Sequence, residues 1–566
     1  MKHLVLPLVL ALVLSPRSES EPLELADIVF VNGNVHTVND AQPQAEAIAI
    51  KGERIVFVGS NADANKYSGA TTRTIDLKGK TVVPGFTDSH YHIFGVGHQA
   101  AQPSFDETTS RGAVLARVKA EAEEGGPGKW ITGRGWIETF WKPADFLNRK
   151  ELDKVAPANP VFLERIDGHG AVANSKALQL AGIDPKTPDP FGGKILHDKK
   201  TGEPTGMLLD NAMDLVAAKI PPPTPEEKGR EFLLGVQRTI ALGWCEIQNA
   251  GSDLGELALM LKLYDEGKVK LRIYNAVYGP GEAAEKILKD GPILDAFNRH
   301  FTTRTIKVIF DGSLGSRSAA LLQPYADAET SGFLTQKEAD LRPMLREALR
   351  RGIQVETHAI GDRANHTILD LYEEAFKAVP PNGRKVKEPR WRVEHAQILS
   401  PSDIPRFAKL SVIASMQPSH AISDLFFASR RLGEERLAGA YAWQSLLKTG
   451  AIIAAGSDAP VERGEPMIEF YAAVARKSRD GFTGPGWHPE QAVSREQALK
   501  MLTRWPAFAA FEERDKGSIE AGKLADLTIL SDDIMKIPEP DILRTRCLMT
   551  VVGGEIVYDS GEIETP

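Results

Sequence analysis

Two histidines lie two residues apart just after a predicted buried strand. His90 and His92 closely follow the apolar run Val82-Val83-Pro84-Gly85-Phe86. Side chains of an extended chain repeat every second residue, so both imidazoles point the same way. Two imidazoles on one face can chelate one cation. The pair therefore indicates metal chemistry.

Three further polar side chains end other predicted strands. His358 lies in Glu356-Thr357-His358, His395 in Val393-Glu394-His395, and Asp458 in Gly456-Ser457-Asp458. Singly, each histidine could bond a neighbour and Asp458 could cap a turn. Four histidines and one aspartate at equivalent strand ends instead favour a metal site. Without cysteine, these groups suit Zn²⁺, Mn²⁺ or Fe²⁺.

Lys307 lies within Thr305–Phe310, a strand of buried type. Burial is costly for a charged amine. One interpretation is an ion pair with Asp311 or another acid. The other is a neutral amine that reacts with CO₂. The resulting carbamate has two oxygens that can bridge two cations.

The elements that must position these residues alternate between apolar strands and amphipathic helices, such as 338–351 and 362–378. Such β–α repeats favour a parallel sheet, and eight of them favour a (β/α)₈ TIM barrel over an open doubly wound sheet. A barrel of this type carries its chemistry at the carboxyl ends of the strands. The eight predicted strands are Thr81–Gly85, Trp244–Asn249, Leu271–Val277, Thr305–Phe310, Ile353–His358, Trp391–His395, Val412–Met416 and Ile452–Gly456.

The 566-residue chain divides into several predicted parts. Residues 21–83 and 511–566 are rich in β-type runs, which predicts one small β-sandwich domain formed from both termini. Residues 84–510 are assigned to the barrel. The segment between its first two strands is too long for an ordinary βα loop. An α/β subdomain is therefore predicted at about residues 105–225, inserted after strand 1 at the active-site face.

Candidate substrate-binding residues are assigned with alternatives. Arg165, Asp167 and His169 in the insert, and Arg317 after strand four, could grip a polar or anionic group. Equally, they could form a local network of ion pairs and turns. Trp136 could form an apolar wall over the pocket together with Phe140 and Trp141, although aromatic residues more often belong to a core.

Composition and the N-terminus limit location and partners. Lys plus Arg number 68 and Asp plus Glu number 76, so a net charge of −8 argues against nucleic-acid binding. The two cysteines form no C-x-x-C motif, which excludes an iron–sulfur cluster, a zinc finger and a disulfide framework. Residues 1–20 have the layout of a signal peptide, which predicts an exported protein without membrane attachment after its removal. A homodimer is the default expectation.

Motifs in family order resemble the amidohydrolase superfamily, specifically its N-substituted formamide deformylase-like branch. The matching stretches are Val83–His92, Asp167-Gly168-His169 with Asn174-Ser175, Lys307–Arg317, His358–Asp362, Glu394–Gln397, Gly456–Pro460, Gly517–Ile519 and Gly522–Leu527.

The resemblance implies a metal centre in a barrel beside a split β-sandwich. His90, His92 and Asp458 would hold one divalent metal, which is expected to be Zn²⁺. His358 and His395 would hold a second, bridged by N6-carboxylysine at Lys307. With a single metal, His90, His92, His358 and Asp458 would be the ligands, and His395 would orient water or substrate.

Three classes of function remain open at this point. The leading hypothesis is a hydrolase of a non-peptide C–N bond in a small molecule, such as an amide, formamide or carbamate. Metal-activated hydroxide would attack, and Asp458 would act as general base and acid. The alternative enzyme is a deaminase or cyclic-amide hydrolase on the same scaffold. The third is a binding protein without turnover, against which the intact set of metal-type residues argues.

Overall fold

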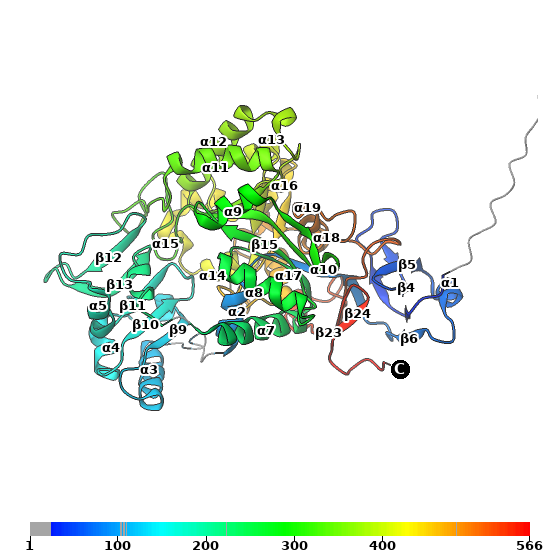
Figure 1. The fold of residues 1–566 in the computed structure, drawn as a ribbon, viewed down its shortest axis with the longest axis horizontal. Coiled ribbons are helices and arrows are strands. Elements are labelled where there is room, and N and C mark those ends of the chain that lie inside the picture. The colour runs from blue at the N-terminus through cyan, green and yellow to red at the C-terminus, as the bar shows by residue number, and fades with distance from the viewer. Residues whose placement is uncertain are drawn as a thin grey trace, which may run out of the picture.

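The computed structural model describes residues 24–101, 105, 108, 110–221, 223–482 and 484–565. The predicted signal peptide, residues 1–20, lies outside this range. The described residues form a central barrel with an insert at one side and sheets from the chain termini at the other (Figure 1). In the described ranges, none of the helices has the length and apolar character needed to cross a membrane.

Parallel strands build the central barrel. Among the described residues, eight strands run side by side from β8 to β21, and β16 adds to the edge of β17. A parallel bridge between Tyr91, which ends β8, and Ala459, which follows β21, closes the ring. The predicted (β/α)₈ barrel is therefore confirmed. In ring order the strands are β8 (Phe86–Tyr91), β14 (Trp244–Asn249), β15 (Arg272–Tyr278), β17 (Phe301–Ile309), β18 (Gln354–Ala359), β19 (Arg392–His395), β20 (Ile413–Met416) and β21 (Ile453–Ala455).

The predicted first barrel strand, Thr81–Gly85, is wrong. Thr81–Pro84 forms β7, which pairs with β2 and β22 in a terminal sheet, while the barrel strand β8 begins at Phe86. The chain changes sheets at Gly85. A Cβ there would lie 2.6 Å from Sγ of Cys245, so only glycine allows this close approach. The continuous apolar run hid this change of sheet.

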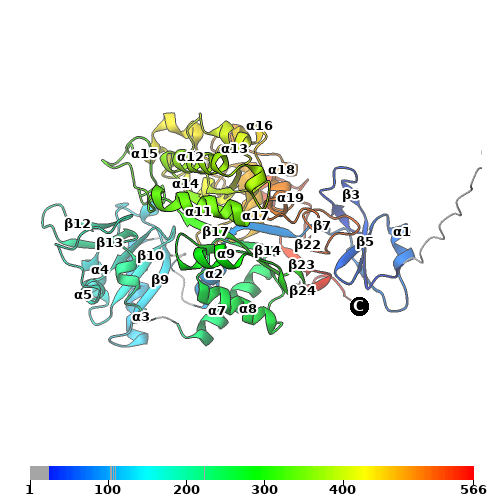
Figure 2. The same cartoon turned by 45° about the horizontal axis from the view of Figure 1, so that its top comes forward.

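The two β-rich ends of the chain form two sheets beside the barrel, and strands from both ends meet in one of them, the six-stranded sheet. A four-stranded sheet has the order β5-β4-β1-β6, and a six-stranded sheet has the order β24-β23-β22-β7-β2-β3. One apolar core joins their inner faces. Blue and red strands therefore lie together (Figure 2). The strands are β1 (Ile28–Val31), β2 (Asn34–His36), β3 (Gln44–Ala45), β4 (Ala47–Lys51), β5 (Arg54–Gly59), β6 (Arg73–Asp76), β22 (Leu527–Leu530), β23 (Cys547–Val552) and β24 (Glu555–Asp559).

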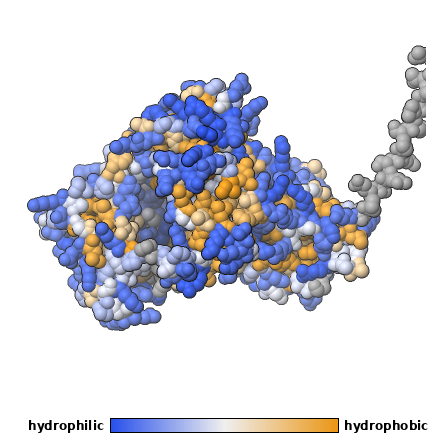
Figure 3. Space-filling model, in the orientation of Figure 1, coloured by the Kyte–Doolittle hydropathy of each residue, from blue (hydrophilic) through white to orange (hydrophobic). Residues whose placement is uncertain are grey.

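An α/β insert separates β8 from β14 along the chain. Its mixed sheet has the order β12-β13-β11-β10-β9, and each face carries an apolar cluster of its own. A hollow lies between this insert and the barrel (Figure 3). Its elements are α3 (Arg111–Gly125), β9 (Ile131–Trp136), α4 (Arg149–Val155), β10 (Val161–Arg165), β11 (Gly170–Ala173), α5 (Ser175–Ala181), β12 (Gly193–His197), β13 (Pro204–Asp210) and α6 (Asp214–Ala217).

Helices cover the barrel. The two helices predicted from their amphipathic pattern, α11 (Glu338–Arg351) and α12 (Asp362–Ala378), have the predicted bounds. The helix α7 (Pro225–Ala241) begins with Thr224 as N-cap, which accepts the Glu227 N–H. The other helices longer than one turn are α2 (Ile93–Ala101), α8 (Leu254–Asp265), α9 (Glu282–Asp290), α13 (Ile404–Leu410), α14 (Pro418–Asp424), α15 (Ala428–Leu432), α16 (Trp443–Lys448), α17 (Pro466–Ala475), α18 (Arg495–Met501) and α19 (Arg504–Ala509).

A buried ion pair fastens the barrel to the terminal sheets. Arg272 of β15 donates from Nε to Oδ2 of Asp526 at 2.7 Å and from Nη2 to Oδ1 at 3.0 Å. Burial by itself would raise the pKa of Asp526, but the Arg272 charge and hydrogen bonds outweigh burial and hold that pKa below its usual value. Asp526 also accepts the Gly553 N–H. One carboxylate thus joins three segments.

We predict that Asp526→Asn strongly destabilises the protein. The substitution leaves a buried guanidinium without its counter-charge, which costs about 3–5 kcal/mol. Urea unfolding followed by circular dichroism measures the loss. Asp290→Asn is the matched control, because Asp290 forms an exposed pair with Lys286 and should change stability little. Equal effects of the two substitutions would contradict the prediction.

Candidate metal centre

The first and last barrel strands bring three predicted ligands together. Nε2 of His92 lies 3.1 Å from Oδ1 of Asp458, and Nε2 of His90 lies 3.5 Å from the same oxygen. Candidate ligand atoms of the three residues all lie within 4.8 Å of one another. His90 and Asp458 are buried, and His92 is partly exposed. The arrangement matches a predicted cation site.

Closure of the barrel sets this geometry. The Asp458 N–H donates to the His90 carbonyl at 2.7 Å, and the His92 N–H donates to the Ala459 carbonyl at 2.9 Å. Behind them, Asp88 Oδ1 accepts the N–H groups of His90 and Ser457. Burial raises the pKa of Asp88 to about 7 despite these hydrogen bonds. The ends of strands one and eight are therefore held together by backbone and side-chain bonds.

The Asp458 carboxylate stays ionised in this setting. Burial opposes its charge, but the hydrogen bond from His92 and the charges of neighbouring histidines outweigh burial. Together they hold the pKa of Asp458 well below its usual value. Its φ of 60° lies in the left-handed region, which aspartate tolerates better than most residues. Asp458 is thus held in the ionised form, which can bind a cation or accept a hydrogen bond.

Lys307 lies inside the barrel beside His90. Its side chain is almost fully buried, and Nζ lies 3.2 Å from His90 Nε2. Asp311 is not its partner, because that carboxylate accepts backbone N–H groups of Ile360, Gly361 and Ala320. Asp311 is therefore excluded as the ion-pair partner of Lys307. The alternative of another acid stays open, because the Lys307 charge lowers the pKa of both Glu356 and Glu394 against the effect of their burial.

Glu394 supports the candidate ligand His90 from behind, a role that the sequence analysis did not predict. The carboxyl of Glu394 is hydrogen-bonded to Nδ1 of His90. Burial and then repulsion from Glu356 raise the pKa of Glu394 to about 8. The bond leaves Nε2 of His90 facing Asp458 and Lys307. A histidine held in this way at its second nitrogen is typical of metal ligands.

His358 and His395 extend the cluster along strands five and six. Their ring centroids lie 4.5 Å apart, and the His395 ring lies 4.7 Å from that of His90. Nδ1 of His395 is bonded to Oε1 of Gln417 at 2.8 Å, and Nε2 of His358 lies 3.4 Å from Asp311. Burial lowers the pKa of both imidazoles. Neutral imidazoles are the form that binds metals.

His420 joins the cluster without having been predicted. It lies in α14, just after strand β20, with its ring 5.7 Å from that of His395. Its Nε2 lies 3.5 Å from Oδ2 of Asp458, and His395, His420 and Asp458 form a second group that could hold a cation. Its sequence signal was the position of Gln417-Pro418-Ser419-His420 directly after the seventh predicted strand.

These residues fit a divalent cation by their donor chemistry. They offer imidazole nitrogens and a carboxylate without a thiolate, which suits Zn²⁺, Mn²⁺ or Fe²⁺. His90 and His395 are each held at Nδ1, so their Nε2 atoms face the cluster, where that of His90 also contacts Nζ of Lys307. His420 Nε2 is buried and has no hydrogen-bond partner within the described ranges.

Three predicted substrate residues lie where the insert meets the barrel mouth. Arg165 forms ion pairs with Glu138 and Asp167, and Asp167 accepts a hydrogen bond from Ser313 of the barrel at 2.8 Å. Nδ1 of His169 is bonded to Asp210, and its ring lies 5.0 Å from that of His358. Arg165 and Asp167 thus form a local network of ion pairs, which was one of the two alternatives that the sequence left open. His169 reaches the histidine cluster itself.

Trp136 lies elsewhere. Its side chain is fully buried in the insert, stacks on Trp141 and donates from Nε1 to the Leu163 carbonyl at 3.0 Å. The proposed pocket wall is therefore corrected: Trp136 belongs to the core of the insert. The apolar side chains of β9 pack against helices α3 and α4 of the insert. The sequence pattern of such a strand is the same whether it faces helices or a pocket.

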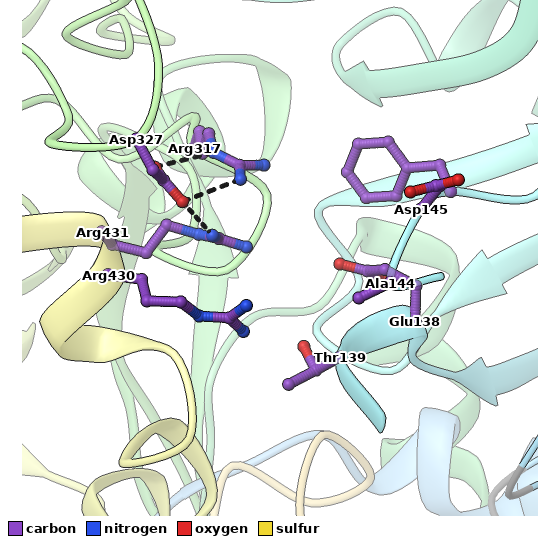
Figure 4. Close-up of a pocket in the computed structure, with 9 residues that line it drawn as sticks. Glu138, Thr139, Ala144, Asp145, Arg317, Asp327, Arg430 and Arg431 are labelled. Carbon is purple, nitrogen blue, oxygen red and sulfur yellow. Dashed lines mark hydrogen bonds and ion pairs between the residues drawn. The ribbon is translucent and has the colours of Figure 1, made fainter. Parts of the chain in front are cut away.

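Arg317 lines a cavity of about 250 Å³ between insert and barrel (Figure 4). Its guanidinium bonds both oxygens of Asp327, and Arg431 shares that carboxylate. Arg430 extends from the same side toward Thr139 of the insert. The Asp327 carboxylate is thus shared by Arg317 and Arg431. Arg317 therefore acts here as a structural ion-pair partner.

Comparison with known proteins identifies the family. A sequence profile described as the amidohydrolase family matches residues 73–558, most of the chain. The chain belongs to the amidohydrolase family. Protein LONG AFTER FAR-RED 3 of Arabidopsis thaliana is 34% identical to this amidohydrolase over 548 residues, covering 94% of this chain and 92% of the plant protein.

Two other relatives are informative about chemistry. N-substituted formamide deformylase of Arthrobacter pascens is 28% identical over 549 residues, covering 95% of this amidohydrolase and 99% of the deformylase. The crystal structure of an uncharacterized metal-dependent hydrolase from Pyrococcus horikoshii OT3 is 27% identical with a TM-score of 0.72, covering 90% and 99% of the two chains. This amidohydrolase is accordingly a metal-dependent hydrolase of C–N bonds other than peptide bonds.

We predict that at pH 9, where the Glu394 carboxyl is ionised, Glu394→Gln weakens metal binding by about 10- to 100-fold, because the neutral amide is a poorer partner for His90 than the carboxylate. Competition with a chromogenic chelator measures the affinity, and mass spectrometry measures the metal content. Glu231→Gln is the matched control, since Glu231 is bonded to the exposed His98. Unchanged affinity in Glu394→Gln would show that this contact does not support the centre.

Proposed function

We propose that this amidohydrolase cleaves the C–N bond of an amide, formamide or carbamate in a small molecule. The observation that carries the proposal is the convergence of His90, His92 and Asp458 at the mouth of the barrel. A group of this kind can hold a cation next to an ionised carboxylate. The similarity to N-substituted formamide deformylase supports an amide-type bond as the target.

The reaction follows from the proton-accepting position of Asp458. A divalent metal, when bound, supplies Lewis-acid chemistry that lowers the pKa of water and polarises a carbonyl. Asp458 accepts one proton from the attacking water as the water oxygen bonds to the carbonyl carbon. Asp458 then delivers that proton to the leaving nitrogen as the C–N bond breaks. The products are a carboxylic acid and an amine from an amide or formamide, and a carbonic acid monoester and an amine from a carbamate.

We further propose Zn²⁺ as the metal and carboxylation of Lys307. His90, His92 and Asp458 would hold one ion, and His358, His395 and carboxylated Lys307 would complete a centre for two. The Lys307 nitrogen would add to the carbon of CO₂ and lose a proton, which gives a carbamate with two oxygens. Its burial beside His90 supports this role.

We predict that Asp458→Asn loses turnover by about 10²- to 10⁴-fold while much of the metal remains bound. The amide cannot accept the proton of water, yet His90, His92 and the other histidines of the cluster stay in place. A panel of amides, formamides and carbamates is first screened by product release, and the best substrate is used for kcat. Metal content is measured by mass spectrometry on both proteins.

Asp63→Asn is the matched control, because Asp63 lies on the exposed helix α1 (Asn61–Ala64), away from the barrel. Near-normal turnover by Asp458→Asn would exclude the proton-transfer role. Absence of turnover of the whole panel by the metal-loaded, unmodified protein would contradict the proposed function.

A further inference from the structure

The two oxygens of Asp458 face different partners. Oδ1 lies near Nε2 of His92 and His90, whereas Oδ2 lies 3.5 Å from Nε2 of His420. The first side is the predicted cation side. The second side belongs to the other group that could hold a cation, His395, His420 and Asp458. It is also the side where a reacting water and a substrate carbonyl can meet both Asp458 and His420.

His420 has a buried nitrogen without a hydrogen bond. The residue is 8% exposed, and Nε2 makes no hydrogen bond within the part of the chain that the structure describes, even to Asp458. Leaving a buried polar nitrogen unsatisfied costs about 1–3 kcal/mol. Such a group is explained if a bound molecule supplies the missing partner.

The surroundings hold His420 in place. The neighbouring Ser419 N–H donates to Oε2 of Glu469 at 2.9 Å, which anchors the start of α14. Gln417, the residue before α14, holds His395. The His395 and His420 rings lie nearly parallel, at 19°. His420 is therefore pre-positioned beside the cluster, as a catalytic donor must be.

We propose that His420 is a catalytic residue that donates a hydrogen bond from Nε2 to the carbonyl oxygen of the substrate. The proposal rests on the proposed hydrolysis. As the water oxygen attacks, negative charge develops on the carbonyl oxygen, and a donor fixed beside it stabilises that charge. Asp458 and His420 then form an acceptor and a donor on the substrate side of the centre. Metal ligation by His420 is the competing role.

The test compares His420→Ala with His420→Asn, which keeps an N–H donor. We expect kcat to fall about 10²- to 10³-fold in His420→Ala, with KM changed far less, and to recover in part in His420→Asn. Metal content and the visible spectrum of the Co²⁺-substituted protein should stay unchanged. His98→Ala is the control, because His98 is exposed and pairs with Glu231.

A binding measurement keeps the test independent of turnover. Methylphosphonate is a tetrahedral anion that imitates the attacked carbonyl, and calorimetry measures its affinity for the metal-loaded protein. We expect at least tenfold weaker binding to His420→Ala than to His98→Ala. Equal affinity, or loss of metal and a changed Co²⁺ spectrum in His420→Ala, would overturn the proposal. Failure of the substrate panel would instead contradict the proposed hydrolysis.

A different observation points to the kind of substrate. In the strand register, Tyr278 of β15 is paired with Lys307, and Ile309 of β17 is paired with His358. Paired residues of neighbouring parallel strands point to the same face of the sheet. Lys307 and His358 point into the barrel, so Tyr278 and Ile309 point into it as well, directly beside the proposed centre.

These two side chains are unusually exposed for large apolar groups. Tyr278 is 40% and Ile309 is 38% exposed, whereas Tyr274, deeper on the same face of β15, is 2% exposed. The Tyr278 ring packs over Gly251, where a Cβ would lie 2.3 Å from it. Glycine at this position, with φ of 120°, lets the ring lie flat. The mouth therefore presents a fixed apolar surface.

We propose that Tyr278 and Ile309 form a subsite for an alkyl or aryl substituent of the substrate. The proposal rests on the proposed hydrolysis and names the substrate class as amide-type compounds with an apolar group. A surface of this kind gains free energy when an apolar group covers it, because apolar area leaves water.

The test measures binding of methyl-, propyl- and phenylphosphonate to the metal-loaded protein by calorimetry. We expect affinity to rise about fourfold for each added methylene, and Ile309→Asn to flatten this series. Leu294→Asn is the matched control: Leu294 is 50% exposed and lies in β16 (Ile293–Asp295), which pairs with β17 near its start, at Thr303. A flat series in the unmodified protein, or equal flattening by both variants, would overturn the proposal. A rising series with no turnover of the substrate panel would contradict the hydrolysis alone.

Discussion

Closure of the barrel between strands β8 and β21 is the constraint on which the site depends. Two backbone hydrogen bonds join residues 90 to 92 with Asp458 and Ala459. Asp88 adds side-chain bonds to Ser457 from behind. The same bonds that close the fold therefore bring the first two histidines to the aspartate. Loss of closure would separate the candidate ligands even if every side chain remained.

A second feature is the set of buried ionisable side chains below the centre. Lys307, Glu356, Glu394 and Arg392 are all buried inside the barrel. Buried ionisable groups are tolerated only where they are paired, hydrogen-bonded or bound to a metal. Here Glu394 orients His90, and Lys307 lies next to the same imidazole. The interior thus supports the chemistry of the mouth, where a purely apolar core would provide packing alone.

The insert and the terminal sheets play different parts. The Asp167–Ser313 bond and the contact of His169 with the His358 ring bring the insert to the active-site face. The terminal sheets meet the barrel at its opposite end, where Arg272 and Asp526 pair. Chemistry and anchoring are consequently separated along the barrel axis, as in other enzymes with this architecture.

The sequence by itself determined the barrel, its helices and the main polar side chains, because strand periodicity and strand ends are local properties. His90, His92, His395 and Asp458 could be found from their positions after apolar runs. Only the tertiary structure decided that the chain leaves one sheet for another at Gly85, that Trp136 is core, and that Glu394 and His420 belong to the site. These facts depend on contacts between segments far apart in the chain, such as His420 with Asp458, which no local pattern records.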